Sequence, residues 1–143
     1  MWQVREARAE DLTAIEKLVE SVDGDLYQLD QGQFVVAESQ GGMILGCGRL
    51  RPYPEFCELA SLAVDQEQRT NGVGRAIVTR LLELYTGDIY LICEDHVVSF
   101  FSRFGFRPAP LDEMPEGLQP KWQYFRNLVS SMNVMLLERP QGD

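Results

Sequence analysis

The chain has 143 residues, of which 45% are hydrophobic and 24% charged, a composition typical of a globular protein with one core. Thirteen Lys and Arg residues stand against 22 Asp and Glu residues, and the resulting net charge of −9 argues against binding to nucleic-acid phosphates. The acidity is compatible with a cationic partner, and it also serves solubility alone. We therefore expect a single domain over residues 1–143, with no nucleic-acid partner.

Three cysteines, Cys47, Cys57 and Cys93, lie in apolar stretches and show no paired spacing such as C-x-x-C. Free cysteine in such surroundings behaves as a small core residue. The chain has one histidine, so a zinc site built from Cys and His is not expected, and the sequence predicts no metal. No segment resembles a signal peptide or a membrane span. These features predict a cytoplasmic protein without a membrane partner.

The first part of the chain predicts a strand, a helix and a hairpin. The pattern of residues 2–10 indicates a strand, and Asp11 is a typical N-cap for a following helix. The apolar positions at helical spacing are Leu12, Ile15, Leu18 and Val19. A polar loop then covers residues 21–32. Two β-rich runs, residues 34–39 and 43–51, flank a glycine turn and predict a hairpin.

The remainder of the chain alternates strands with helices. Residues 56–64 predict an apolar central strand, and an amphipathic helix follows Gly74 and ends near Gly87. The apolar stripe of that helix comprises Ile77, Val78, Leu81, Leu82, Leu84 and Tyr85. The later elements are a strand over 88–93, a short helix within 95–104, a turn at Gly105 into a strand, a helix opening at Pro120 and a strand over 130–139. Hairpin-connected strands followed by this alternation indicate an α/β fold with a mixed sheet.

The stretch from Arg69 to Gly74, RTNGVG, places two glycines at the start of a helix. The first N–H groups of a helix lack partners within the helix and carry the positive end of its dipole. Glycine lets the backbone approach a phosphate closely, so this turn can bind a phosphate, with Arg69 and Arg75 adding charge. The spacing matches neither a P-loop nor a dinucleotide fingerprint. The alternative is that Gly72 and Gly74 only shape a tight turn.

The pattern Arg69-x-x-Gly72-x-Gly74 resembles the [Q/R]-x-x-G-x-[G/A] acyl-CoA loop of the GNAT acetyltransferase superfamily. The preceding residues 58–68 resemble the E-L-x-x-L-x-V strand of that family, and FFSRFGF, residues 100–106, resembles its F-Y-x-x-x-G-F element. The three motifs occur in the family's order and cover residues 56–107. The resemblance implies a GNAT-like mixed sheet flanked by helices, with antiparallel N-terminal strands and a parallel central pair that is splayed at the cofactor site.

The same resemblance implies an N-acetyltransferase that uses acetyl-CoA. The pantetheine arm would pair with the backbone of Leu62, Ala63 and Val64. The pyrophosphate would lie on the N–H groups of the turn, which comprises Arg69, Thr70, Asn71, Gly72, Val73, Gly74 and Arg75.

Glu58 lies where several family members carry a general base, which would take the proton of the attacking amine. Strand alternation places Glu58 on one side with Ala60, Leu62 and Val64. The alternative is an exposed glutamate without a catalytic role. The developing oxyanion would be held by backbone N–H near Leu62 or Val64.

The sequence departs from the family at Phe101, which occupies the slot of a tyrosine that often serves as the general acid. Phe101 can pack against the sulfur end of pantetheine, but it cannot donate a proton. Nearby donors are Ser99, Ser102, His96 and Tyr90, and each also has an ordinary structural explanation. We expect water to supply this proton.

The acceptor is expected to be the primary amine of a small molecule or an amino acid. Acidic residues that could attract it are Asp23, Asp25 and Asp30, unless they form a solvated loop. Candidates for holding a substrate carboxylate are Arg49, Arg51 and Arg126, the last within an aromatic cluster of Trp122, Tyr124 and Phe125. Acetylation of a protein lysine or N-terminus, and a non-catalytic acyl-CoA-binding module, remain alternatives. A homodimer is left open.

Overall fold

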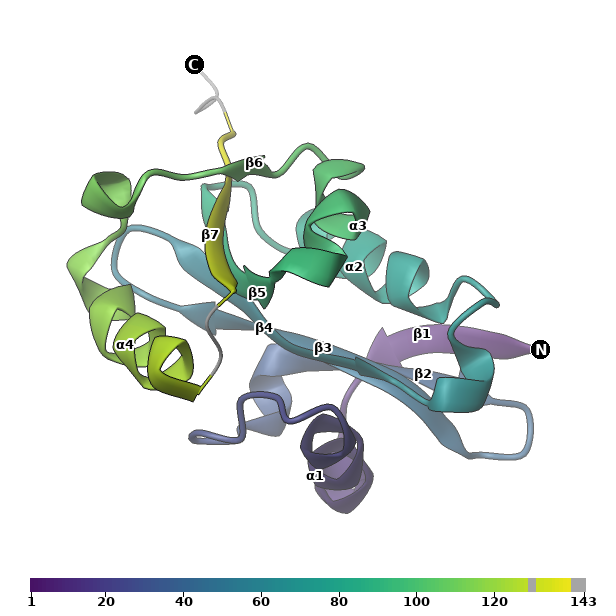
Figure 1. Cartoon of the computed structure of the whole chain (residues 1–143). Coiled ribbons are helices and arrows are strands. Elements are labelled where there is room, and N and C mark those ends of the chain that lie inside the picture. Colours follow the sequence, from purple (N-terminus) through teal and green to yellow (C-terminus); the bar gives the residue numbers. More distant parts are fainter. Residues whose placement is uncertain (129–130, 140–143) are drawn as a thin grey trace. The chain divides into compact units, whose positions relative to one another are not determined.

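Seven strands form one mixed sheet in the spatial order β1-β2-β3-β4-β5-β7-β6 (Figure 1). The strands are β1 (Trp2–Glu6), β2 (Phe34–Ser39), β3 (Ile44–Pro52), β4 (Cys57–Val64), β5 (Ile89–Glu94), β6 (Arg107–Pro108) and β7 (Met132–Leu137). The helices are α1 (Leu12–Ser21), α2 (Val73–Glu83), α3 (Val98–Ser102) and α4 (Gln119–Leu128). This computed structural model describes residues 1–128 and 131–139. The predicted α/β fold with a mixed sheet is confirmed.

The chain divides into two compact units. The N-terminal unit comprises Met1–Arg51 and Leu59–Thr86, and the C-terminal unit comprises Pro52–Glu58 and Gly87–Asp143. Strand β4 runs from one into the other, since its first two residues belong to the C-terminal unit. The single domain expected from the chain length stays a prediction.

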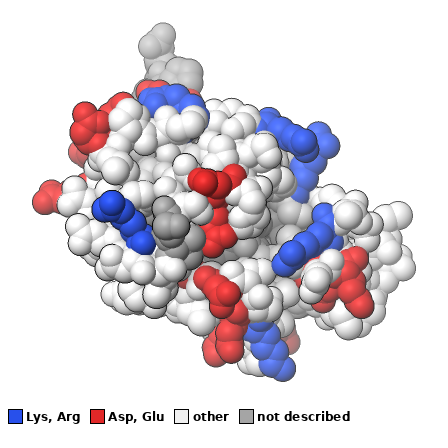
Figure 2. Space-filling view, viewed as in Figure 1, with Lys and Arg blue, Asp and Glu red and all other residues white. Residues whose placement is uncertain are grey.

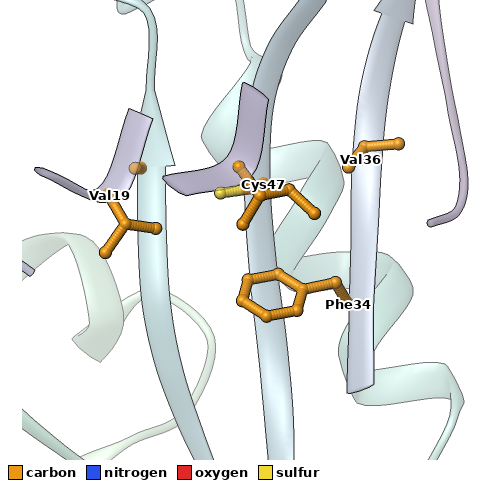
Figure 3. Close-up of a cluster of buried hydrophobic side chains, with 6 residues drawn as sticks. Val19, Phe34, Val36 and Cys47 are labelled. Carbon is orange, nitrogen blue, oxygen red and sulfur yellow. The ribbon is translucent and has the colours of Figure 1, made fainter. Parts of the chain in front are cut away.

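In the N-terminal unit, β1, β2 and β3 pair antiparallel, and β2 and β3 form the predicted hairpin. Cys47 on β3 faces the apolar side of α1, where Ile15, Val19, Phe34, Val36 and Ala63 bury their side chains around it (Figure 3). The opposite side of β3 carries Gly46, and a Cβ there would lie 2.8 Å from Val73 and 2.9 Å from Ile77 of α2. Glycine therefore lets α2 pack directly on the strand backbone, while α1 covers the other face (Figure 1).

In the C-terminal unit, the first residues of β4 pair parallel with β5, and β7 pairs antiparallel with both β5 and β6. Among the described residues, the β4–β5 pairing is confined to Cys57↔Ile89 and Glu58↔Tyr90. Helix α4 buries Trp122 against Ala109, Val134 and Leu136. The predicted splay of β4 and β5 beyond Glu58 depends on how the two units are placed, and it stays a prediction.

Several element boundaries differ from the expectation. Strand β1 ends at Glu6, before the predicted end at residue 10. Asp11 is the N-cap residue of α1, as predicted, but its carboxylate does not bond to the helix and instead accepts from Arg5 Nη1 at 2.8 Å and from the Arg8 N–H at 2.7 Å. Helix α2 ends at Glu83, well before Gly87, and Leu84 of the predicted apolar stripe is 49% exposed. The last strand covers Met132–Leu137, and Ser130 of the predicted strand lies outside the described residues.

The predicted core role of the three cysteines is confirmed, because Cys47, Cys57 and Cys93 are all buried and free.

On the face in Figure 2, the described Lys and Arg side chains occur in small groups among acidic and uncharged ones. None of the described helices is both long and apolar enough to cross a membrane.

Candidate active site

The carboxylate of Glu58 is the centre of the candidate site. Its side chain is 0% exposed, and its Oε2 accepts a hydrogen bond from Nζ of Lys121, whose side chain is 15% exposed. Tyr53 Oη donates to Glu58 Oε1 at 3.4 Å. A buried carboxylate is costly unless a countercharge and donors compensate for its lost hydration. The sequence identified Glu58 but missed Lys121 and Tyr53.

The connection between β3 and β4 places Tyr53 beside this carboxylate. The Tyr53 N–H donates to the Phe56 carbonyl at 2.9 Å, and the two rings stack with their centroids 4.5 Å apart and their planes 8° from parallel. The backbone at Gly117 approaches the Tyr53 ring so closely that a Cβ there would lie 3.1 Å from it. Packing on both sides thus restricts the tyrosine ring.

Helix α4 supplies Lys121 from a distant part of the sequence. Pro120 lies in the first turn of the helix, where its missing N–H costs no helical hydrogen bond. Trp122 is 8% exposed and anchors the helix on β7. The Lys121 ammonium lies 5.8 Å from the centroid of the Phe125 ring, one turn further along the helix. The ammonium therefore contacts a carboxylate and an aromatic face of the same unit.

Strand β4 runs from Cys57 to Val64, and Ser61 within it has a φ of +54°. A non-glycine residue in this region breaks the regular pleat of a strand. Strict alternation therefore cannot be assumed across Ser61, and the placement of Glu58, Ala60, Leu62 and Val64 on one side stays a prediction. A positive φ at a serine is invisible in a pattern of apolar residues.

The three residues expected to pair with pantetheine follow this interruption. Ala63 is 3% exposed and packs in the core with Cys47, whereas Leu62 and Val64 are half-buried. Pairing of their backbone with a cofactor stays a prediction.

The glycine turn lies at the start of α2, as predicted. Gly72 is the N-cap with a φ of +81°, and its carbonyl accepts the first helical hydrogen bond, from the Ala76 N–H at 3.0 Å. The N–H groups of Val73, Gly74 and Arg75 therefore precede the helical ladder. Apart from its two chain neighbours, no atom of the described residues lies within 4 Å of the position that a Cβ would take on Gly72. The side chains of Arg69, Thr70, Asn71 and Arg75 are exposed, and Val73 is fully buried.

Comparison with known proteins identifies the family. A family model described as an acetyltransferase (GNAT) domain matches residues 30–108. The amino-acid acetyltransferase of Mycobacterium tuberculosis is 34% identical over 119 residues, which cover 72% of this chain and 67% of that protein. The chain belongs to the GNAT acetyltransferase family. The resemblance inferred from the three motifs is thereby confirmed, and acetyltransferase is the enzyme class of this family.

Another relative is much longer than this chain. The amino-acid acetyltransferase of Vibrio atlanticus is 28% identical over 147 residues, which cover 92% of this chain but only 33% of the relative. Thus the chain spans about a third of that protein's length.

Solved structures share the fold. N-acetylglutamate synthase from Neisseria gonorrhoeae, complexed with coenzyme A and N-acetyl-glutamate, aligns with a TM-score of 0.78 and 18% identity, over 99% of this chain and 36% of that one. A Mycobacterium tuberculosis protein in complex with CoA and NLQ also has a TM-score of 0.78, with 24% identity over 96% of this chain and 99% of that one. The GNAT-like fold is therefore confirmed, and CoA, the predicted cofactor, is a ligand of both structures.

The residue in the tyrosine slot of the GNAT motif lies in an aromatic cluster. Phe101 is 6% exposed and contacts the rings of Phe100 and Phe106 edge to face, at centroid distances of 5.1 and 5.9 Å. Ser102 Oγ donates to the Val98 carbonyl at 2.9 Å, and Ser99 is exposed. Phe101 thus has a packing role within its own unit, and its contact with pantetheine stays a prediction.

The other two candidates for the proton donor, His96 and Tyr90, each contact another residue of the fold. The side chain of His96 is 73% exposed and lies 3.3 Å from Glu94. Tyr90 Oη lies 3.5 Å from the Glu113 carbonyl, and burial raises the pKa of the Tyr90 hydroxyl, so it keeps its proton at neutral pH. Neither contact identifies a general acid.

Arg49 and Arg51, which were candidates for holding a substrate carboxylate, instead make hydrogen bonds to the loop at residues 25–28. Arg49 is fully buried, and its donors reach Ser61 Oγ at 3.0 Å and the Tyr27 carbonyl at 2.8 Å. Arg51 Nη1 donates to Asp25 Oδ2 at 2.9 Å. These contacts overturn the substrate roles suggested for Arg49 and Arg51, and they also explain Asp25, which pairs with arginine and not with an acceptor amine.

The remaining candidates for the acceptor site are the loop residues Asp23 and Asp30 and the aromatic cluster with Arg126 on α4. Asp23 and Asp30 are exposed, and Asp30 accepts a hydrogen bond from the Gly32 N–H at 2.9 Å. On α4, Trp122 packs in the core, whereas Tyr124 is 62% exposed and Arg126 is exposed. Among residues 1–128 and 131–139, no group of three His, Cys, Asp or Glu side chains could hold a metal ion.

Proposed function

We propose that this chain is an acetyl-CoA-dependent N-acetyltransferase that acetylates the amine of an amino acid. The observation that carries the proposal is the fully buried Glu58 carboxylate in contact with an ammonium group, on the strand that continues into Leu62–Val64. Such a carboxylate can hold a cationic nitrogen and take its proton. Relatives named amino-acid acetyltransferase and a fold shared with a structure containing N-acetyl-glutamate support an amino-acid acceptor.

The turn before α2 fits the phosphates of the donor. At Gly72 the space above the backbone is open, and the N–H groups of Val73, Gly74 and Arg75 begin the helix. Exposed Arg69 and Arg75 add positive charge, so an anion there is favoured by both the helix dipole and the side chains. The backbone of Leu62–Val64 would pair with the amide groups of pantetheine. When bound, acetyl-CoA supplies a thioester carbonyl for attack by an amine.

Glu58 prepares the amine for that attack. An amino-acid amine is mostly protonated at neutral pH and has no free electron pair. Transfer of its proton to the Glu58 carboxylate, directly or through one water, makes the nitrogen nucleophilic. The new C–N bond would form as the C–S bond breaks, and the nitrogen would lose its second proton to solvent. The thiolate would leave unaided or take a proton from water, since an ordinary thiol has a pKa of ~8.5.

A matched pair of variants tests the role of Glu58. Glu58→Gln keeps the side-chain volume but removes the base, and we expect kcat/KM for the amino acid to fall about 10²- to 10⁴-fold. Glu55→Gln is the control, because Glu55 is exposed and three residues away. Release of CoA thiol is measured with a panel of amino acids from pH 6 to pH 9. If Glu58→Gln retains nearly normal kcat/KM at every pH, Glu58 is not the general base.

A non-catalytic acyl-CoA-binding module is the second candidate, favoured by Phe101 in the slot of the usual proton donor. Calorimetric titration with CoA, combined with amine and peptide panels, separates the functions. Tight CoA binding without thiol release from any amine would favour the binding module. Turnover only with peptides would instead favour acetylation of proteins.

A further inference from the structure

The chain contains only two lysines, Lys17 and Lys121, and their surroundings differ sharply. Lys17 is exposed on α1. Lys121 is 15% exposed, and its Nζ donates to the carboxylate of Glu58. The side-chain amine of Lys121 therefore already lies where the proposed base would receive the proton of an acceptor.

We propose that Nζ of Lys121 is a self-acetylation site, which the protein modifies with acetyl-CoA when no acceptor amine is present. This inference rests on the proposed function, because it uses the same donor and the same base. A tethered amine needs no binding step, so its effective concentration at the base is far higher than that of a free amine.

The reaction follows the course proposed for an external amine. The Lys121 ammonium transfers a proton to Glu58, and the neutral nitrogen attacks the thioester carbonyl. The C–N bond forms as the C–S bond breaks, and the thiolate leaves with the electron pair and takes a proton from water, while Glu58 returns its proton to solvent. The second proton of the nitrogen passes to solvent. One lysine ammonium and one acetyl thioester thus give acetyl-lysine, a thiol and one proton.

The contacts of Lys121 allow such a transfer. Its four-carbon stem is flexible, whereas the helix that bears it is anchored by the buried Trp122. The ammonium is held by charge, through Glu58 and the face of the Phe125 ring. Acetylation removes that charge and both attractions.

The test compares the two lysines within one protein. The folded protein is incubated with acetyl-CoA without acceptor, digested, and analysed by peptide mass spectrometry. We expect acetylation of Lys121 to exceed that of Lys17 roughly tenfold or more. Acetic anhydride, which needs no enzyme, should instead favour the exposed Lys17. Protein unfolded in urea should show no preference with either reagent.

Variants and competition connect the modification to the site. Glu58→Gln should reduce Lys121 acetylation to the level of Lys17, whereas the control Glu55→Gln should leave it unchanged. Lys121→Arg keeps a cation but should lose the acetyl-CoA-dependent increase in mass. If Glu58→Gln does not fold, the wild-type protein still provides a test, since an excess of the amino-acid acceptor should suppress Lys121 acetylation.

The outcomes separate this inference from the proposed function. Turnover of an amino acid together with equal acetylation of Lys17 and Lys121, or none at Lys121, overturns the inference and leaves the function standing. Absence of both amino-acid turnover and acetylation overturns the two together. Lys121 acetylation that persists unchanged in Glu58→Gln overturns the role given to the carboxylate.

Discussion

The substitution Lys121→Met tests how strongly Glu58 depends on its countercharge. It keeps most of the side-chain length but removes the ammonium from a carboxylate that is 0% exposed. Removing one partner of a buried ion pair typically costs about 3–5 kcal/mol, because the other charge stays buried without compensation. Lys121 is 15% exposed and Tyr53 Oη remains 3.4 Å from the carboxylate, so water and one donor offset part of the loss. We therefore expect a loss of about 3 kcal/mol.

The partner variant should cost less. Glu58→Gln removes the negative charge, and the partly exposed Lys121 can turn towards solvent, so we expect a loss of about 1–2 kcal/mol. In the double variant no charge is left buried, and its loss should be smaller than the sum of the two single losses. The amount by which the double variant's loss falls below that sum is the coupling energy of the ion pair.

Urea unfolding followed by circular dichroism at pH 7 measures these losses. Lys17→Met is the matched control, since Lys17 is exposed, and it should change the free energy of unfolding by less than about 0.5 kcal/mol. The reasoning is refuted if Lys121→Met unfolds at the same urea concentration as Lys17→Met, or if the double variant loses the full sum.

Three further predictions follow from backbone geometry and pKa shifts. Gly72→Ala should lower stability by about 1–2 kcal/mol in urea and weaken CoA binding by calorimetry, because Gly72 has a φ of +81° but open space around it. The hydrogen bond from Arg5 holds the pKa of Asp11 below its usual 3.8, so this carboxylate stabilises the fold fully above about pH 4, and the contribution is lost below pH 4 as the pH falls through the lowered pKa. Asp11→Asn should thus lower the melting temperature at pH 7 and weaken its decline towards pH 2. Burial raises the pKa of Cys47 and of Cys93 to about 12 each, and neither thiol should react with iodoacetamide at pH 8 until the protein unfolds.

Sequence patterns predicted the elements of the fold well where local physics determines them. Two apolar runs around a glycine turn gave the β2–β3 hairpin, and the turn at Gly72 gave the start of α2. The ends of the elements were predicted less well. Asp11 precedes α1 as predicted, but its carboxylate bonds to Arg5 and to the Arg8 N–H and not to the helix, and β1 already ends at Glu6. Leu84 matched the helical stripe, but α2 ends one residue before it.

The candidate site was predictable only in part. Glu58 became a candidate through the resemblance of its strand and the following turn to GNAT motifs, which stand in fixed order in the chain. Its partner Lys121 lies 63 residues away, on a helix whose packing depends on Trp122, and no local pattern connects the two. Arg49 and Arg51 failed for the same reason, since their partner Asp25 belongs to a loop whose path only the folded chain reveals.

The Glu58–Lys121 pair also bears on how an acceptor would be selected. A fully buried carboxylate without a cation would be strongly destabilising, so in the absence of substrate Lys121 supplies the cation. An acceptor ammonium that reaches Glu58 exchanges one cation for another, and the carboxylate is never left uncompensated. A neutral ligand of the same shape would displace Lys121 without replacing its charge, at a cost of about 3 kcal/mol or about 150-fold in affinity. Under the proposed function, an α-amino acid should therefore compete with acetylation of Lys121, whereas the corresponding α-hydroxy acid should not.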